Sequence, residues 1–253
     1  MELTSYQWLV IMLCALITGI SKTGLPGIGI LAVPLMAMVI PAKQSVGLVL
    51  PTLIFADIFA AFYYRRHADW SHLVKLLPCA TIGVIVGFKL MKYVDDTSLK
   101  PIIGAIVMAM LILQSAYEWN RKRTKQPDTE PENPHANIAL AIVFGLIAGA
   151  TSVMANAAGP VMLLYLLAMK LPKNEFIGTS AWYFFIMNWV KVPFLCSLGL
   201  ITAKSLKVNL ISAPAIAVGA VAGIFLLKKI PQKLFQILAR IMTALSSLKL
   251  LFS

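Results

Sequence analysis

The sequence predicts an all-α integral membrane protein, and composition is the first reason. Of 253 residues, 59% are hydrophobic and 13% are charged, and the mean hydropathy is +0.83. Soluble domains carry about 25% charged residues, so this composition excludes a soluble fold. A spanning helix needs roughly 20 mostly apolar residues, which leaves room for about eight transmembrane helices plus shorter broken or re-entrant helices.

The second reason is the order of the apolar runs, five on each side of a polar stretch. They cover residues 5–20, 28–40, 44–64, 73–91 and 101–119, then 136–150, 158–170, 176–198, 206–227 and 234–252. The polar stretch holds cations, acids and prolines, a composition that does not bury a core. We therefore predict a first transmembrane repeat at 1–120, a cytoplasmic linker at 121–135 and a second repeat at 136–253.

The two halves also repeat local patterns. Pro41 with Gly47 returns as Pro172 with Gly178, at an offset that lays Asp57 over Asn188. Gly83 and Gly87 return as Gly219 and Gly223 a few residues further along. Repeated patterns of this kind predict related structural units.

The direction of the repeats depends on the first two runs of each half. If these runs form one broken crossing, the repeats are parallel, and if they enter and return, the repeats are inverted. Lysine and arginine gather on the cytoplasmic side of membrane proteins, and the inverted arrangement places more of them on the linker side. Inverted repeats are therefore favoured. The same rule explains the net charge of +12 without a nucleic-acid partner.

Two polar, glycine-rich interruptions, 21–29 and 151–160, break the apolar runs at matching places. Non-helical backbone is tolerated at membrane depth only where protein or a water-filled cavity surrounds it. Paired interruptions indicate the substrate site of a transporter, and helix N-termini at such breaks bind anions. The alternative is that both are ordinary turns outside the membrane.

The first interruption carries Lys22 between two hydroxyl side chains, a set that suits a small oxyanion. The alternative for Lys22 is that it extends to the interface from a turn. Asn156, in the second interruption, adds an amide donor or caps a helix. The candidate substrate-binding residues are Ser21, Lys22, Thr23, Gly24, Gly27, Asn156 and Lys191.

Three ionisable residues lie well inside apolar runs, where a charge costs at least ~2.5 kcal/mol and marks a pathway or a pair. Asp57 is the candidate for proton coupling, with a permanent ion pair to Lys191 as the equal alternative. Lys191 shares a helix face with Asn188 and is a candidate anion ligand. Arg240 is interpreted as extending to the interface.

Enzyme and metal signatures are missing from the sequence. The three cysteines show no metal or disulfide spacing, and the three histidines fall outside the apolar runs. There is no HExxH, nucleotide-binding loop or GxSxG motif. We expect no catalytic residue, no metal and no cofactor, with transport driven by an ion gradient in which protons can take part.

The chain resembles the sulfite exporter TauE/SafE family. The resemblance rests on residues 19–27, residues 41–47 and a weaker second copy of this pattern over residues 149–178. The resemblance implies a multi-pass protein of the bacterial inner membrane that moves sulfite, sulfonates or other small organic anions. The second copy has no lysine to match Lys22, which argues against a symmetric two-cation site.

These observations together predict a secondary transporter, with export favoured, for a small sulfur-containing or organic anion in the lipid bilayer. An anion channel and a membrane scaffold subunit that docks a partner through the linker are the alternatives. A homodimer is left open.

Overall fold

The computed structural model describes most of the chain. The described residues are 3–23, 28–124, 134–169, 171 and 173–229, with 241, 244, 245, 248, 249, 251 and 252 near the end. These residues form helices and contain no strand. The helices are α1 (Ser5–Thr23), η1 (Ile28–Leu31), α2 (Ala32–Val39), α3 (Ala42–Tyr63), α4 (Trp70–Tyr93), α5 (Asp96–Thr124), α6 (Pro134–Ala155), α7 (Ala158–Ala168), α8 (Lys173–Ser197) and α9 (Ala203–Lys229).

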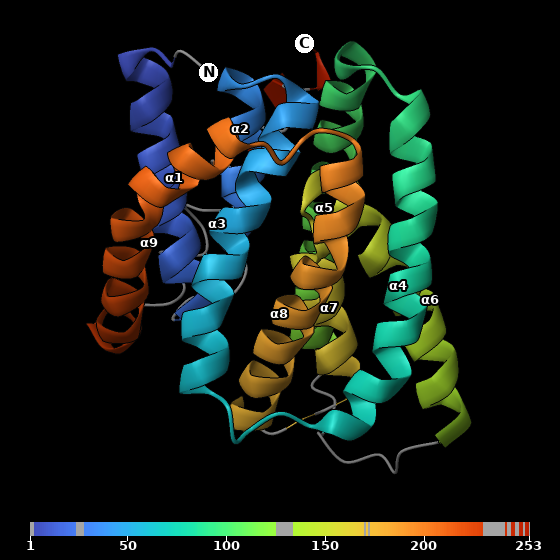
Figure 1. The fold of residues 1–253 in the computed structure, drawn as a ribbon. Helices are drawn as coiled ribbons and strands as arrows, with labels where there is room; N and C mark the ends of the chain where they lie inside the picture. The colour runs from blue at the N-terminus through green and yellow to red at the C-terminus, as the bar shows by residue number, and fades with distance from the viewer. Residues whose placement is uncertain are drawn as a thin grey trace.

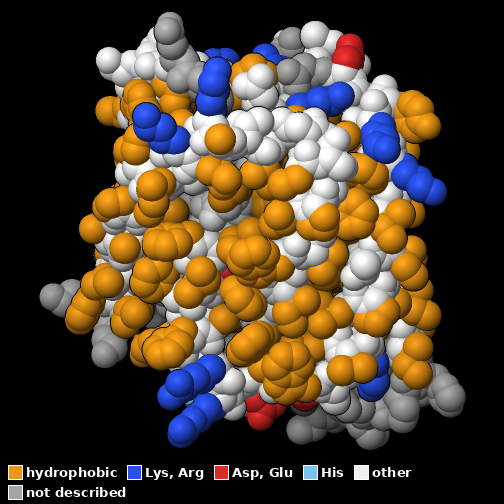
Figure 2. All heavy atoms as spheres, in the orientation of Figure 1, with side chains coloured by type: hydrophobic (Ala, Val, Ile, Leu, Met, Phe, Trp, Pro, Cys, Tyr) orange, Lys and Arg blue, Asp and Glu red, His pale blue; other side chains and the backbone are white. Residues whose placement is uncertain are grey.

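The predicted fold class, an all-α membrane protein, is confirmed. In the described part of the chain, five helices are long and apolar enough to cross a membrane, namely α1, α3, α4, residues Ile138–Ala155 of α6 and residues Ala203–Phe225 of α9. Figure 2 shows a broad band of apolar side chains across the molecule, with lysine and arginine side chains above and below it. The predicted number of about eight transmembrane helices stays a prediction.

The first two helical segments form a hairpin that enters and returns. The side-chain amide of Gln7, near the start of α1, donates to the carbonyl of Val39 at the end of α2, at 2.8 Å. Helices α6 and α7 pack on each other as a second hairpin. In Figure 1 the first hairpin begins and ends at the upper edge, and the second begins and ends at the lower edge. This arrangement supports the interpretation as inverted repeats.

Two close helix crossings correspond to each other between the halves. Helix α9 packs mainly on α1, and α4 packs mainly on α6. A Cβ at Gly219 of α9 would clash with the Leu16 carbonyl of α1, and a Cβ at Gly83 of α4 would clash with the Leu146 carbonyl of α6. Each half therefore contributes one helix to each crossing, and glycine permits the close approach.

The connections between the long helices also make contacts that correspond between the two halves. Gly47, in the first half of α3, lies against Leu200 in the connection that leads to α9. Gly178, at the matching place in α8, lies against His67 in the connection that leads to α4. Helices α3 and α8 also pack on each other near the middle of the bundle (Figure 1). The domain boundaries predicted from the sequence stay predictions.

Candidate functional site

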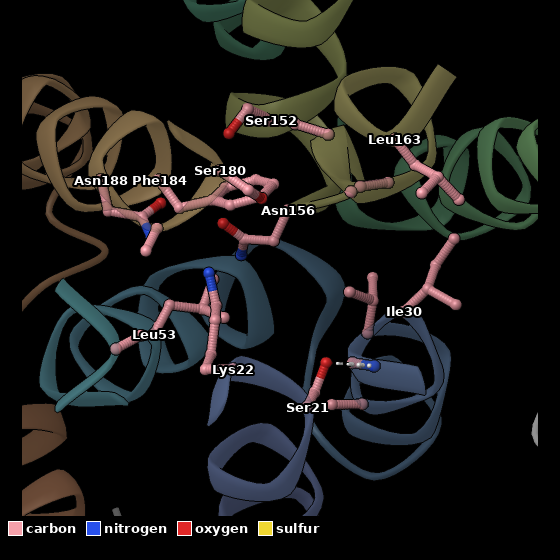
Figure 3. A pocket seen from close by; sticks show the side chains of 18 of the residues that line it. Ser21, Lys22, Ile30, Leu53, Ser152, Asn156, Leu163, Ser180, Phe184 and Asn188 are labelled. Atoms are coloured by element: carbon pink, nitrogen blue, oxygen red, sulfur yellow. Dashed lines mark hydrogen bonds between the residues drawn. The ribbon is translucent and has the colours of Figure 1, made fainter. Parts of the chain in front are cut away.

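A cavity of about 110 Å³ lies between the tips of the two hairpins and helices α3 and α8. By this measure a water molecule needs about 10–15 Å³, so the cavity accepts a small ion or molecule. Figure 3 shows Lys22 and Asn156 pointing toward each other near Asn188, whereas Ile30 and Leu163 lie on the other side. The cavity therefore has one polar side and one apolar side.

The polar side begins with a lysine from the last turn of α1. Lys22 Nζ lies 2.6 Å from Asp57 Oδ1 of α3, and it also lies over the Phe184 ring, 4.0 Å from its centroid. Asn188 of α8 donates to the other carboxylate oxygen of Asp57 at 2.5 Å. Asp57 is fully buried, whereas the Lys22 side chain is 15% exposed and lines the cavity. Asp57 thus sits behind Lys22 as its partner.

A second lysine reaches the cavity from α8. Lys191 is fully buried, and its Nζ donates to Asn156 Oδ1 at 2.9 Å and to the Ser152 carbonyl at 3.3 Å. Both acceptors belong to the end of α6 and both are neutral. Among the described residues, no carboxylate lies within 4.0 Å of Lys191. A buried charge is costly without a counter-charge, so Lys191 favours an anion in the cavity.

Asn156 is held in the break between α6 and α7 by its backbone and by its amide. Its φ of 48° is left-handed, a conformation that asparagine tolerates better than most residues. The side-chain amide donates to the Val46 carbonyl of α3 at 3.1 Å, which leaves Oδ1 for Lys191. The next residues, Ala158 and Gly159, line the cavity. The N-terminal end of α7, which carries a partial positive charge, is thereby directed at it.

The structure shows how far each helix extends into its polar interruption. Ser21, Lys22 and Thr23 continue α1, and residues 151–155 continue α6, so neither interruption is non-helical from its first polar residue. The hydroxyl of Thr23 satisfies the local carbonyl of Gly19 and the carbonyl of Ala220 in α9, at 3.2 and 2.7 Å. These bonds stabilise the last turn of α1.

The candidate residues of the first break divide into three groups. Lys22 and Ser21 line the cavity, and Ser21 Oγ accepts from the Gly29 backbone N–H at 3.0 Å. Thr23 faces α9 and does not line the cavity, so its predicted role in substrate binding is not supported by its position. Gly24 and Gly27 lie outside the described residues.

The ion pair predicted as the alternative for Asp57 has a different partner. The sequence reading paired Asp57 with Lys191, but Asp57 contacts Lys22 and Lys191 contacts Asn156. The reason is geometric, because Lys22 reaches Asp57 from the last turn of α1, whereas Lys191 reaches the end of α6. Arg240 and most of the linker, from residue 125 to 133, lie outside the described residues.

Four residues that line the cavity were not among the candidate site residues chosen from the sequence, and three of them lie on α8. Ser180, Phe184 and Asn188 lie on one face of α8 together with Lys191. Their spacing of three and four residues is that of a single helix face, so this signal was available once Lys191 was chosen. The fourth missed residue, Ser152, contributes its backbone carbonyl, which no side-chain pattern reveals.

The described part of the chain contains no cluster of side chains suited to bind a metal ion. No group of three or more His, Cys, Asp or Glu side chains comes together there. The three cysteines are free and lie apart, with Cys14 buried in α1 and Cys196 exposed at the end of α8. The ionisable side chains that line the cavity are Lys22 and Lys191, and the Asp57 carboxylate lies behind Lys22.

Comparison with known proteins identifies the family of the chain. No curated protein and no solved structure matches the chain. The family model described as sulfite exporter TauE/SafE matches residues 11–250, which is nearly the whole length. The chain therefore belongs to the sulfite exporter TauE/SafE family of multi-pass membrane transport proteins.

Proposed function

We propose that the protein is a secondary transporter of a small anion such as sulfite or a sulfonate, that it acts in the bacterial inner membrane, and that it has no catalytic role. The observation that carries this proposal is Lys191, a fully buried lysine whose hydrogen-bond acceptors are neutral and which lines a cavity. A small anion in that cavity would supply the missing counter-charge. The family resemblance favours export, and the net direction depends on the gradients of the anion and of any coupled ion.

The positions of the two hairpins support a carrier. The tip of each hairpin, where its two helical segments meet, lines the cavity, and the two hairpins approach it from opposite edges of the bundle (Figure 1). Transporters with inverted repeats alternate access when one repeat rocks against the other around a fixed site. Residues from both halves, Lys22 and Lys191, line this cavity, so a rocking movement would change its access while the ligands stay together.

The experiment uses the full-length protein in detergent and then in proteoliposomes. Thermal unfolding is measured with sulfite, sulfate, thiosulfate, sulfoacetate, methanesulfonate, acetate and chloride, because a ligand that binds only the folded state raises Tm. We expect one or more of the sulfur or organic anions to raise Tm and to show saturable flux into proteoliposomes. Flux that rises linearly with concentration would indicate a channel instead.

Lys191→Met separates binding from folding. Methionine keeps the unbranched apolar stem and removes a buried ionisable group that has no counter-charge among the described residues and is therefore costly to bury. We expect Lys191→Met to unfold at the same or a higher temperature and to lose the stabilisation by anions. Lys204→Met, at an exposed lysine of α9, is the matched control and should retain it. Equal stabilisation of Lys191→Met and wild type would overturn the proposal.

A further inference from the structure

We propose that Asp57 is a built-in counter-anion for Lys22, and that a proton on Asp57 releases Lys22 to the substrate, so that one proton and one anion cross the membrane in the same direction. This inference rests on the proposed function, because it concerns the same cavity. It adds to that function a proton as the coupling ion, a stoichiometry of one proton per anion, and the Lys22–Asp57 pair as the place where the anion and the proton bind.

The first step is the position of the Lys22 ammonium. Its Nζ contacts the Asp57 carboxylate on one side, lies on the Phe184 ring and borders the cavity. An ammonium has three N–H donors, so it can contact the carboxylate and still face a ligand. The carboxylate is fully buried and does not line the cavity, so an anion reaches Lys22 without displacing Asp57 from its place.

The second step is the charge of the site. With Asp57 ionised, its charge cancels that of Lys22, and Lys191 alone attracts an anion. When Asp57 binds a proton, it becomes a neutral carboxylic acid, and both lysines attract the anion. The step is a protonation of one carboxylate oxygen, and no other bond forms or breaks. Nearby opposite charges interact strongly in a partly dry site, so the anion binds more tightly to the protonated form.

The third step is to identify every charge that acts on Asp57. These are Lys22 from α1 and Lys191 from α8, and the amide of Asn188 completes its surroundings. The other described helices that pack on α3, which are α2, α5, α6 and α9, add no charged group to this set. The proton equilibrium of Asp57 is therefore controlled by the two lysines that also bind the anion.

The fourth step follows from thermodynamic linkage. If a proton on Asp57 strengthens anion binding, a bound anion strengthens proton binding by the same factor. The doubly loaded and the empty sites are then the favoured forms, which is the requirement for coupled movement. Anion affinity should rise as pH falls, and an applied pH gradient should drive the anion from the acidic side to the other side.

The test uses Asp57→Asn, a variant that keeps the shape of the side chain and cannot ionise. The probe is methanesulfonate, which stays a monoanion across the tested range, so its own titration does not interfere. Its Kd is measured with the full-length protein between pH 8 and pH 6. Glu175→Gln, at an exposed acid of α8, is the matched control.

We expect the wild-type Kd to fall with pH, with a limit of about tenfold per pH unit for one linked proton. Asp57→Asn should bind at pH 8 at least as tightly as wild type at pH 6, with a flat pH profile, and Glu175→Gln should follow wild type. In proteoliposomes, Asp57→Asn should retain anion exchange and lose uptake driven by an acidic exterior. A pH-dependent Kd in Asp57→Asn equal to that of wild type would overturn the inference.

The double variant Lys22→Met/Asp57→Asn covers the case in which Asp57→Asn does not fold. It removes both members of the Lys22–Asp57 ion pair together, so neither of them is left buried without the other. It should bind methanesulfonate more weakly than Asp57→Asn and without pH dependence, and a wild-type pH profile in it would overturn the inference. If wild type binds no anion at any pH, the proposed function fails, whereas pH-dependent binding that survives these variants defeats the coupling alone.

Discussion

Asn188 donates a hydrogen bond to Asp57 at 2.5 Å, and these two residues occupy matching positions in the two halves, 131 residues apart. In an inverted repeat, a residue contacts its own counterpart only near the axis that relates the halves. On the predicted inverted-repeat arrangement, the contact places the Lys22–Asp57 pair close to that axis, where α3 packs on α8. It also makes the halves unequal, because one side supplies a carboxylate and the other a neutral amide.

Loss of this amide should destabilise the protein. Asn188→Ala removes a donor to a fully buried carboxylate, and a hydrogen bond to a charged group contributes about 1.5–3 kcal/mol. We expect a lower Tm in detergent. The control is Thr52→Val, which keeps the shape of the side chain and removes the hydroxyl that donates to Asn209; loss of this neutral hydrogen bond should cost about 0.5–1.5 kcal/mol. A smaller loss for Asn188→Ala than for Thr52→Val would contradict this account of Asp57.

The two glycine crossings should be equally intolerant of a side chain. In Gly219→Ala and Gly83→Ala, the new methyl group meets backbone carbonyls that cannot move independently, at Leu16 and Leu146. Overpacking of this kind costs about 1–3 kcal/mol, so both variants should show a lower Tm. Gly159→Ala is the control, because nothing lies within 4 Å of its added Cβ. A Tm for Gly219→Ala equal to that of Gly159→Ala would show that the crossing is looser than described.

Thr23 should matter for stability and not for the anion. Thr23→Val keeps the shape of the side chain and removes the hydroxyl that bonds the Ala220 carbonyl, a loss of about 1 kcal/mol for a buried hydrogen bond. We expect a lower Tm and an unchanged Kd for methanesulfonate. If the Kd rises as much as in Lys191→Met, Thr23 belongs to the binding site and its orientation toward α9 is not the functional one.

Several features followed from the sequence because they depend on local composition and spacing. The apolar composition predicted the membrane fold, and the interrupted runs predicted where the hairpins end. Charges within apolar runs singled out Asp57 and Lys191, since a buried ionisable residue is too costly to occur without a reason. The same spacing argument placed Asn188 beside Lys191 on one helix face.

The partners of these residues were decided by tertiary structure. The sequence offered Lys191 as the alternative partner of Asp57 and placed Thr23 in the site, whereas the fold pairs Asp57 with Lys22 and turns Thr23 toward α9. Periodicity indicates which residues share a face of one helix, but not which face of another helix lies opposite. That choice depends on the close crossing of α1 with α9 at Gly219, which brings the end of α1, and Lys22 with it, to the buried carboxylate of α3.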